Sequence, residues 1–362
     1  MTAIGFGRAP HQNRTTIRTS TAAARMPRRN NRREALGEVS IYIDYAFFEV
    51  FSLYWLFFLK IFCDLIVIQQ TRRWNGQRLK ITIKTRIWLL GLVSLTGILL
   101  VLATQYHVSS EVLAENAEMV DRLEQTDRFS RLAHELQRER GLSNAFLAQR
   151  EESVHAELRA QRLATDHRVA NLDAGQRGVL AGLAGMATMR ERVSRAELES
   201  AATFDFYTGI LSSIFAEVTR LAKAPGAHPM RSDLFAHAGL IHAKEYLGQA
   251  RAGLATAPAA GRIDPAWVAA MGRLVGLFES HLDLFLRDAN PALKEAMLAA
   301  LREPEMVTAR RLIAGAMAGR TIEQIGVPRR DWYAAITAGV DLLREMERYS
   351  LIELQAEAAR RQ

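Results

Sequence analysis

The chain has 362 residues, of which 49% are hydrophobic and 24% are charged, and this balance excludes a disordered or fibrous protein. Its 47 Lys and Arg against 39 Asp and Glu give a formal net charge of +8. The single cysteine, Cys63, excludes an internal disulfide framework and a cysteine-based metal cluster.

The positive charge is concentrated at the N-terminal end. Residues 1–86 hold 15 Lys and Arg against five Asp and Glu, a net charge of +10, whereas residues 87–362 hold 32 against 34, a net charge of −2. We expect residues 1–40 to form a basic, disordered tail without a function of its own. No aromatic platform accompanies its arginines, so we predict a solvated cytoplasmic flank and no nucleic-acid partner.

Residues 41–69 are aromatic and very apolar, yet they include Glu49, Lys60 and Asp64. Basic clusters lie on both sides of this segment, which conflicts with the charge rule for a single membrane crossing. Three interpretations stay open: a first membrane helix, an interfacial helix, and a segment that is not in the mature protein. In the last case the first ~75 residues are an over-extended start, and an anchored receptor begins near Arg78.

Residues 87–106 (IWLLGLVSLTGILLVLATQY) carry no formal charge over a length that suffices to cross a membrane as a helix. A basic flank, residues 70–86, precedes the segment, and acidic side chains follow it within a predicted juxtamembrane helix, residues 107–124. The positive-inside rule places the flank in the cytoplasm and the rest of the chain outside. We therefore expect a bacterial inner-membrane protein with a periplasmic domain. A buried core helix fits less well, because so long an uncharged run is rare in soluble folds.

From residue 108 onward, apolar residues recur at helical spacing and no strand pattern appears. Two of the breaks, Asp264–Pro265 and Asn290–Pro291, match an N-cap followed by proline in the first turn. The breaks divide this region into about seven or eight helices, several of them about 25 residues or longer. Long helices joined by short loops predict an all-α fold, an up-and-down helical bundle preceded by one or two transmembrane helices.

No catalytic or metal-binding motif is recognised. The sequence has no serine-centred nucleophile elbow, no glycine-rich phosphate loop and no HExxH. His134, His155 and His167 share no metal-site spacing with carboxylates. We therefore expect a protein that is not an enzyme, with no catalytic residue, no metal and no cofactor.

Several cations lie on helix faces that are otherwise apolar. At about 100° per residue, four of them fall on the apolar stripe of their own helix: Arg140, Arg162, Lys244 and Arg251. A buried cation is costly unless its donors are satisfied. One interpretation is that internal carboxylates, with Glu139, Asp166 and Glu245 as candidates, hold these cations in structural ion pairs. The other is that the cations converge on an exchangeable anion, because the planar fork of arginine suits a flat oxyanion.

Four segments of this region carry a recognisable pattern. They are HELQRERGLSNAFLAQ (134–149), LRAQRLATD (158–166), AKEYLGQARAGLATA (243–257) and DWYAAITAGVDLLREME (331–347). In this order they resemble helices of the nitrate- and nitrite-sensing (NIT) domain, and the resemblance extends over residues 125–355.

The resemblance implies a helical sensor of packed four-helix bundles that binds nitrate or nitrite between helices through arginines. Carried over onto matching positions, the ligand-binding residues are Arg140 and Arg251, with Arg162 as a third; Lys244, on the same stripe as Arg251, is a fourth candidate. One departure concerns Ala250, which stands where the family has a glutamate. This change either frees Arg251 for an anion or indicates a different ligand.

Relatives of this domain pass their signal to a second membrane helix and an effector, or, in a soluble variant, to an RNA-binding antiterminator module. No such module is recognised here, and residues 356–362 are interpreted as a polar C-terminal tail. The resemblance thus implies a membrane-anchored sensor, a homodimer like other receptors of this build, that acts through a separate signalling partner or is a truncated receptor. The alternative is a structural or interaction protein of the membrane, whose inward cations form fixed salt bridges and bind no anion.

Overall fold

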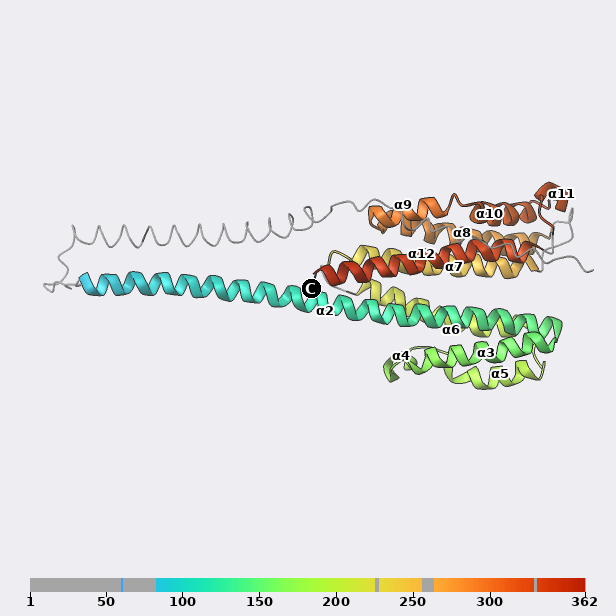
Figure 1. Cartoon of the computed structure of the whole chain (residues 1–362), viewed down its shortest axis with the longest axis horizontal. Coiled ribbons are helices and arrows are strands. Elements are labelled where there is room, and N and C mark those ends of the chain that lie inside the picture. Colours follow the sequence, from blue (N-terminus) through green and yellow to red (C-terminus); the bar gives the residue numbers. More distant parts are fainter. Residues whose placement is uncertain (1–59, 61–82, 225–227, 256–263, 329–330, 362) are drawn as a thin grey trace, which may run out of the picture. The chain divides into compact units, whose positions relative to one another are not determined.

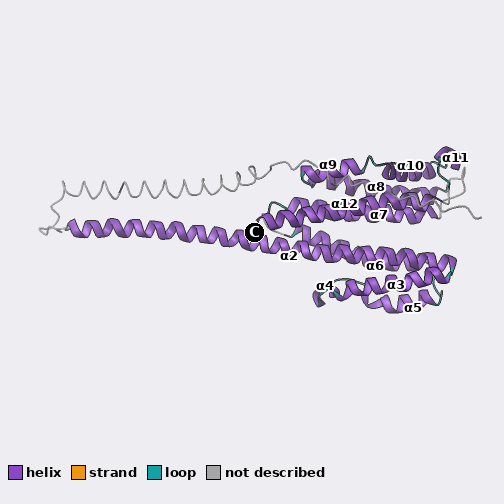
Figure 2. Ribbon diagram, viewed as in Figure 1, coloured by secondary structure: helices purple, strands orange, loops and turns teal. Residues whose placement is uncertain are grey.

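The computed structural model describes Lys60 and residues 83–224, 228–255, 264–328 and 331–361. The predictions for residues 1–40 and 41–69 lie outside these residues, apart from Lys60, which is helical and exposed. The described residues form helices and loops without a strand, which confirms the predicted all-α fold (Figure 2). The chain divides into two units, Met1–Ala103 and Thr104–Gln362.

The helices are α2 (Ile83–Gln149), α3 (Glu152–Ala170), α4 (Ala174–Gly178), α5 (Met186–Ser194), α6 (Ser200–Lys223), α7 (Arg231–Ala255), α8 (Pro265–Asp288), α9 (Pro291–Ala300), α10 (Pro304–Met317), α11 (Ile322–Ile325) and α12 (Trp332–Arg361), with a 3-10 turn, η2 (Leu183–Gly185). These eleven α-helices of the described chain exceed the about seven or eight expected from periodicity. Two of the additional helices, α4 and α11, are single turns that each begin with a capping box, from Asp173 and Thr321. A helix of one turn shows no periodicity, so the pattern of apolar residues does not reveal it.

The predicted N-caps of α8 and α9 are confirmed. The Asp264 side chain accepts a hydrogen bond from the Ala266 N–H at 3.0 Å, and the Asn290 side chain accepts one from the Leu293 N–H at 3.0 Å. Proline occupies the first turn of both helices. It fits there because the missing N–H would have no partner within the helix.

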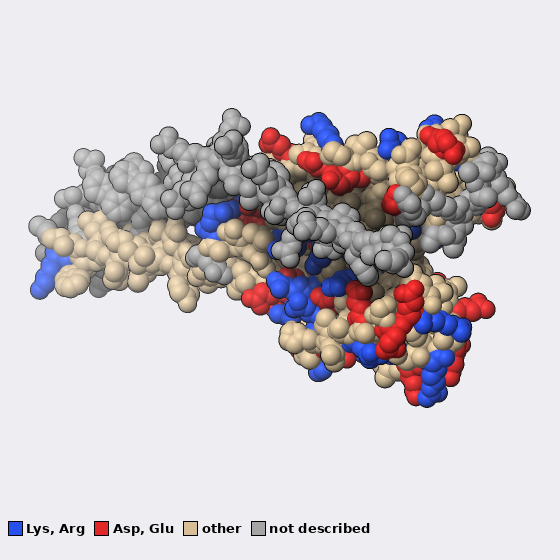
Figure 3. Space-filling model, turned by 45° about the vertical axis from the view of Figure 1, so that its right-hand side comes forward, with Lys and Arg blue, Asp and Glu red and all other residues tan. Residues whose placement is uncertain are grey.

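Helix α2 begins with the apolar segment. Of the described helices it is the one that is long and apolar enough, by length and composition, to cross a membrane. Only 6% of its most apolar stretch is buried, and large side chains such as Trp88, Leu92 and Ile98 are exposed. This exposure distinguishes it from the core helix of a soluble protein. In the space-filling view this part of α2 shows almost no charge, whereas Lys, Arg, Asp and Glu are interspersed on the helical body (Figure 3).

The unit Thr104–Gln362 contains two large hydrophobic cores, and both receive residues from α7 and α12 (Figure 1). One core lies among α7 to α12, and includes Leu240, Phe285 and Leu343. The other lies among α2, α5, α6, α7 and α12, and includes Phe129, Tyr207 and Ile241. Because α7 contributes to both cores, its polar residues His237, Lys244 and Glu245 are buried between packed helices and need protein partners.

Glycines allow two close helix contacts. A Cβ atom on Gly239 of α7 would lie 2.6 Å from Leu284 Cδ2 and 3.2 Å from the His281 carbonyl oxygen of α8. A Cβ atom on Gly339 of α12 would lie 3.0 Å from the Ala309 Cβ of α10. The absence of a side chain therefore sets how closely these helices approach.

Residues 356–361, interpreted above as part of a polar tail, continue α12. Ala358 is buried, and the Asn116 side chain of α2 donates a hydrogen bond to the Arg361 carbonyl oxygen at 2.9 Å. The end of α12 is thus packed against α2.

Candidate functional site

Arg140 lies on α2 where this helix contacts α6 and α7. Its Nη1 donates to Thr208 Oγ1 at 2.9 Å and to Glu245 Oε1 at 2.6 Å, and its Nη2 donates to Glu245 Oε2 at 3.2 Å. The guanidinium carbon also lies 4.5 Å from the centre of the Phe204 ring. Arg140 is only 4% exposed, so this two-point ion pair is shielded from water.

Glu245, the partner of Arg140, is held as a carboxylate. Burial alone would raise its pKa, but the charge of Arg140 and hydrogen bonds from Arg140, Gln249 and Gln137 outweigh burial and lower the pKa below its usual value. The amide of Gln137 donates at 2.7 Å and that of Gln249 at 2.8 Å. The internal ion pair considered for Arg140 is therefore present.

Arg251 lies on α7, six residues after Glu245 and about 9 Å further along the helix axis. Its Nη1 donates to Thr337 Oγ1 of α12 at 3.1 Å, and its guanidinium carbon lies 4.8 Å from the centre of the Tyr333 ring. Within the described chain no carboxylate pairs with it, and its buried Nε has no acceptor. The N–H groups of Nε and Nη2 point the same way, and this edge is one of the two guanidinium edges that can hold a flat oxyanion at two points.

Tyr333 connects the surroundings of the two arginines. Its ring lies against Arg251, and its hydroxyl would be 3.9 Å from a Cβ atom placed on Gly141, the residue after Arg140. Residues from α2, α7 and α12 thus meet around Tyr333. No described contact joins the guanidinium group of Arg140 to Tyr333 or to Arg251, so the convergence of the two arginines on one anion stays a prediction.

Lys244 lies elsewhere, although it precedes Glu245 in the chain. Its side chain is 2% exposed and its Nζ pairs with the Glu347 carboxylate of α12. Consecutive residues of a helix point about 100° apart, which separates Lys244 from the Arg140–Glu245 pair. That Lys244 contacts the anion stays a prediction, and no described contact joins it to Arg140 or Arg251.

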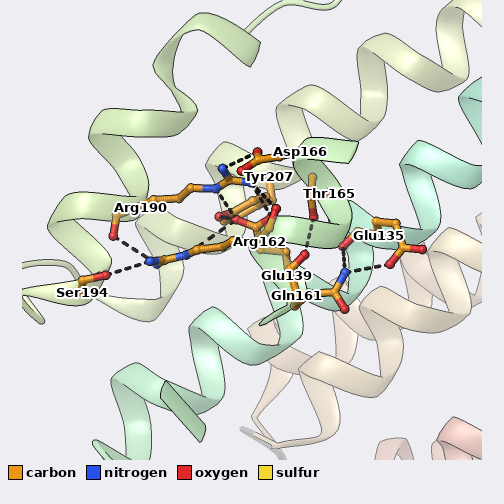
Figure 4. A network of polar contacts seen from close by, with 9 residues as sticks. All are labelled: Glu135, Glu139, Gln161, Arg162, Thr165, Asp166, Arg190, Ser194 and Tyr207. Atoms are coloured by element: carbon orange, nitrogen blue, oxygen red, sulfur yellow. Dashed lines mark hydrogen bonds and ion pairs between the residues drawn. The ribbon is translucent and has the colours of Figure 1, made fainter. Parts of the chain in front are cut away.

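Arg162 belongs to another network, centred on Glu139 (Figure 4). Its Nη1 donates to Ser194 Oγ at 2.8 Å and its Nη2 to the Arg190 carbonyl oxygen at 3.1 Å. The fully buried Glu139 accepts hydrogen bonds from Arg190 at 2.7 and 2.9 Å and from the Tyr207 hydroxyl at 2.7 Å. Burial and the Glu139 charge raise the pKa of Tyr207, so its hydroxyl keeps the proton that it donates. This network ties α2, α3, α5 and α6 together, and a ligand contact by Arg162 stays a prediction.

Sequence periodicity identified the cations but not the neutral residues that hold them. These are Phe204, Thr208, Tyr333 and Thr337. Tyr333 and Thr337 lie within the fourth NIT-like segment, residues 331–347, but nothing in that segment marked them as partners of Arg251. Phe204 and Thr208 lie outside all four segments, so no motif pointed to them.

Comparisons with known proteins agree with the resemblance. A sequence profile described as "Nitrate and nitrite sensing" (NIT) matches residues 131–355, more than half of the chain. The structure is similar to that of the NasR transcription antiterminator, with a TM-score of 0.58 and 20% sequence identity over 72% of this chain and 74% of that chain, which shows a shared fold. No curated protein sequence matches the chain. On the strength of the profile match, the chain belongs to the NIT family of nitrate- and nitrite-sensing proteins.

Proposed function

We propose that the chain is a membrane-anchored sensor that binds nitrate or nitrite through Arg140 and Arg251. The observation that supports this most is the Nε–Nη2 edge of Arg251, which has no acceptor in the described chain. The hydrogen bonds from Arg140 to Glu245 and Thr208 use its Nη1 and one N–H of its Nη2. The Nε–Nη2 edge of Arg140 is therefore also available to an anion. Nitrate and nitrite are planar anions that match the planar guanidinium group. The oxygens of a single anion can thus accept hydrogen bonds from both Arg140 and Arg251.

The structural alternative accounts for three of the four inward cations, including Arg162, whose Nε lies 4.0 Å from Glu139 Oε1. Arg140 pairs with Glu245 and Lys244 pairs with Glu347, as fixed salt bridges require. It does not account for Arg251, which has an aromatic ring and a hydroxyl as neighbours instead of a carboxylate. Ala250, at the position of the family's glutamate, adds no negative charge beside it.

Signalling follows from differential binding. An anion held by both arginines favours the arrangement of α2, α7 and α12 in which these side chains approach each other. Arg140 belongs to α2, the helix that also contains the candidate membrane span. A change at Arg140 therefore has a continuous helix through which to act. In this scheme Arg162 and Lys244 position the surrounding helices through Ser194 and Glu347.

A calorimetric titration of the full chain in detergent micelles with nitrate and with nitrite tests the binding. We expect saturable heat for at least one of these anions and none for chloride or sulfate at matched ionic strength. A well-folded chain that gives no saturable heat with either anion would contradict the proposal. It would support the structural alternative.

We also propose the topology of a bacterial inner-membrane protein with residues 107–362 in the periplasm. The sensor would be a homodimer acting through a separate signalling partner, without enzymatic activity, cofactor or nucleic-acid partner. The net charge of +10 before residue 87 and −2 after it supports this orientation. Alkaline phosphatase fused after residue 361 should be active and green fluorescent protein dark. The opposite pattern would overturn the periplasmic assignment.

A further inference from the structure

A separate cleft of about 310 Å³ opens among α2, α3, α7 and α12. Its charged lining side chains are Asp127, Arg131, Glu135, Arg168, Lys244, Arg344, Glu347 and Arg348. Neither Arg140 nor Arg251 lines it. The cleft is therefore distinct from the region around Tyr333.

Three of the cations in this cleft are paired with its three carboxylates. Arg131 Nε lies 2.7 Å from Asp127 Oδ1, Arg168 Nε lies 3.9 Å from Glu135 Oε1, and Lys244 pairs with Glu347. The remaining two arginines, Arg344 and Arg348, have no ion pair with any described residue.

Arg344 and Arg348 are one helical turn apart on the same face of α12, and both are exposed. Like charges at this spacing repel each other and weaken a helix slightly. The charges of the cleft leave a surplus of two positive charges on these two arginines. A negatively charged ligand would relieve their repulsion.

Two further groups point to a ligand at the inner end of the cleft. Ser130 is 6% exposed, and its hydroxyl has no hydrogen-bond partner among the described residues; His134 Nε2 is buried and has none among them either. Burial first, and then the charges of Arg344, Lys244, Arg138 and Arg168, lower the pKa of His134 to about 3. The imidazole is thus neutral at pH 7, and the positive field that it experiences is the field that would attract an anion.

We propose that this cleft is a second anion site, which binds a phosphate-bearing small molecule with at least two negative charges. Arg344 and Arg348 provide planar forks for the phosphate oxygens, and the Ser130 hydroxyl provides a neutral donor. A volume of about 310 Å³ holds a ligand much larger than nitrate. The surplus of two charges favours a dianion over a monoanion, and this assignment does not depend on nitrate binding elsewhere.

Calorimetric titration of the full chain in detergent with inorganic phosphate and with diphosphate tests the site. We expect saturable binding that weakens about tenfold or more in the double variant Arg344→Ala, Arg348→Ala, because each arginine contributes charge-assisted hydrogen bonds. The matched control is Arg273→Ala, Arg311→Ala, which removes the same charge from exposed positions of α8 and α10 outside the cleft and should bind as the unchanged chain does.

Three further measurements separate the outcomes. Circular dichroism should show equal helix content in both double variants, and the NMR-detected pKa of His134 should rise when diphosphate is added. Glycerol 2-phosphate against inorganic phosphate distinguishes an ester from the free ion as the source. No saturable heat with phosphate or diphosphate, equal weakening in the two double variants, or tighter binding of succinate than of diphosphate would overturn the proposal.

Discussion

At the scale of single residues, Arg140 and Arg251 have the same chemical group in different surroundings. The side chains of Arg140 and Glu245 are 5% and 4% exposed, and each neutralises the other. Arg251 is half-buried and donates to one hydroxyl. Removing the Arg140 side chain should therefore destabilise the chain more than removing the Arg251 side chain, although each removal deletes one positive charge.

We expect Arg140→Ala to lower the free energy of unfolding by about 3–5 kcal/mol, because it leaves the Glu245 carboxylate buried without a countercharge. Arg251→Ala should cost about 1 kcal/mol, the value of a single hydrogen bond. Urea denaturation of the chain in detergent, followed by circular dichroism, measures both. Equal losses of unfolding free energy in the two variants would contradict a special contribution of the buried Arg140–Glu245 pair.

The same comparison shows what the sequence can reveal at this scale. Periodicity alone placed Arg140 and Arg251 on inward faces, since the position of a residue on its own helix depends only on spacing. It offered Glu245 among the candidate carboxylates but could not assign it to Arg140, and it gave no partner for Arg251. Glu245 lies 105 residues after Arg140, and Thr337 lies 86 residues after Arg251. Such pairs depend on how the helices pack, which spacing within one helix does not determine.

At the scale of helices, proline and capping residues predicted the starts of α8 and α9, because an N-cap is a local interaction. The close contact of α7 with α8 was not predictable in this way. A glycine within a helix pattern indicates only lower helix propensity, and the atoms that a side chain would meet belong to another helix. Gly239 and Gly276 illustrate the difference, since the first faces α8 closely and the second faces open space.

Gly239→Ala should therefore destabilise the chain and Gly276→Ala should stabilise it. The new methyl group at Gly239 would meet Leu284 Cδ2 at 2.6 Å and a backbone oxygen at 3.2 Å, and overpacking of this kind costs about 1–3 kcal/mol. At the exposed Gly276, alanine gains about 0.5–1 kcal/mol of helix propensity. Thermal denaturation of both variants measures the signs, and a stabilising Gly239→Ala would show that α7 and α8 tolerate wider separation.

At the scale of the whole molecule, the two cores share α7 and α12, and buried histidines make their stability depend on pH. His237 of α7 is fully buried, and burial lowers its pKa to about 4. Burial and His281 also lower the pKa of His242 to about 4. In the unfolded chain the pKa of histidine is about 6.5. Below this pH the unfolded chain binds protons that the folded chain excludes.

We therefore expect the contribution of His237 and His242 to the free energy of unfolding to be complete above about pH 6.5. It should be lost progressively as the pH falls to about 4. Denaturation midpoints in urea at pH 7.5, 6.0 and 5.0 measure the loss. His237→Gln should reduce the dependence on pH, because glutamine does not titrate. Stability that is constant or rises between pH 6.5 and 5 would contradict the burial of neutral histidines.

The whole-molecule charge was the least informative quantity in the sequence. The net +8 combines a basic N-terminal part with a body of net −2, and the cations relevant to binding are a few buried or half-buried side chains. What distinguishes these cations is the inward helix face on which each one lies and, for Arg251, the lack of an acceptor at Nε among the described residues.

The most direct test of anion binding by Arg251 is the nitrate and nitrite affinity of Arg251→Lys, measured by calorimetry on the full chain in detergent. Lysine keeps the charge but removes the planar fork. We expect binding of the preferred anion to weaken about tenfold or more, the equivalent of one charge-assisted hydrogen bond. The control Arg273→Lys, at an exposed position of α8, should bind as the unchanged chain does. An unaltered affinity in Arg251→Lys would contradict a role for the Arg251 fork in binding.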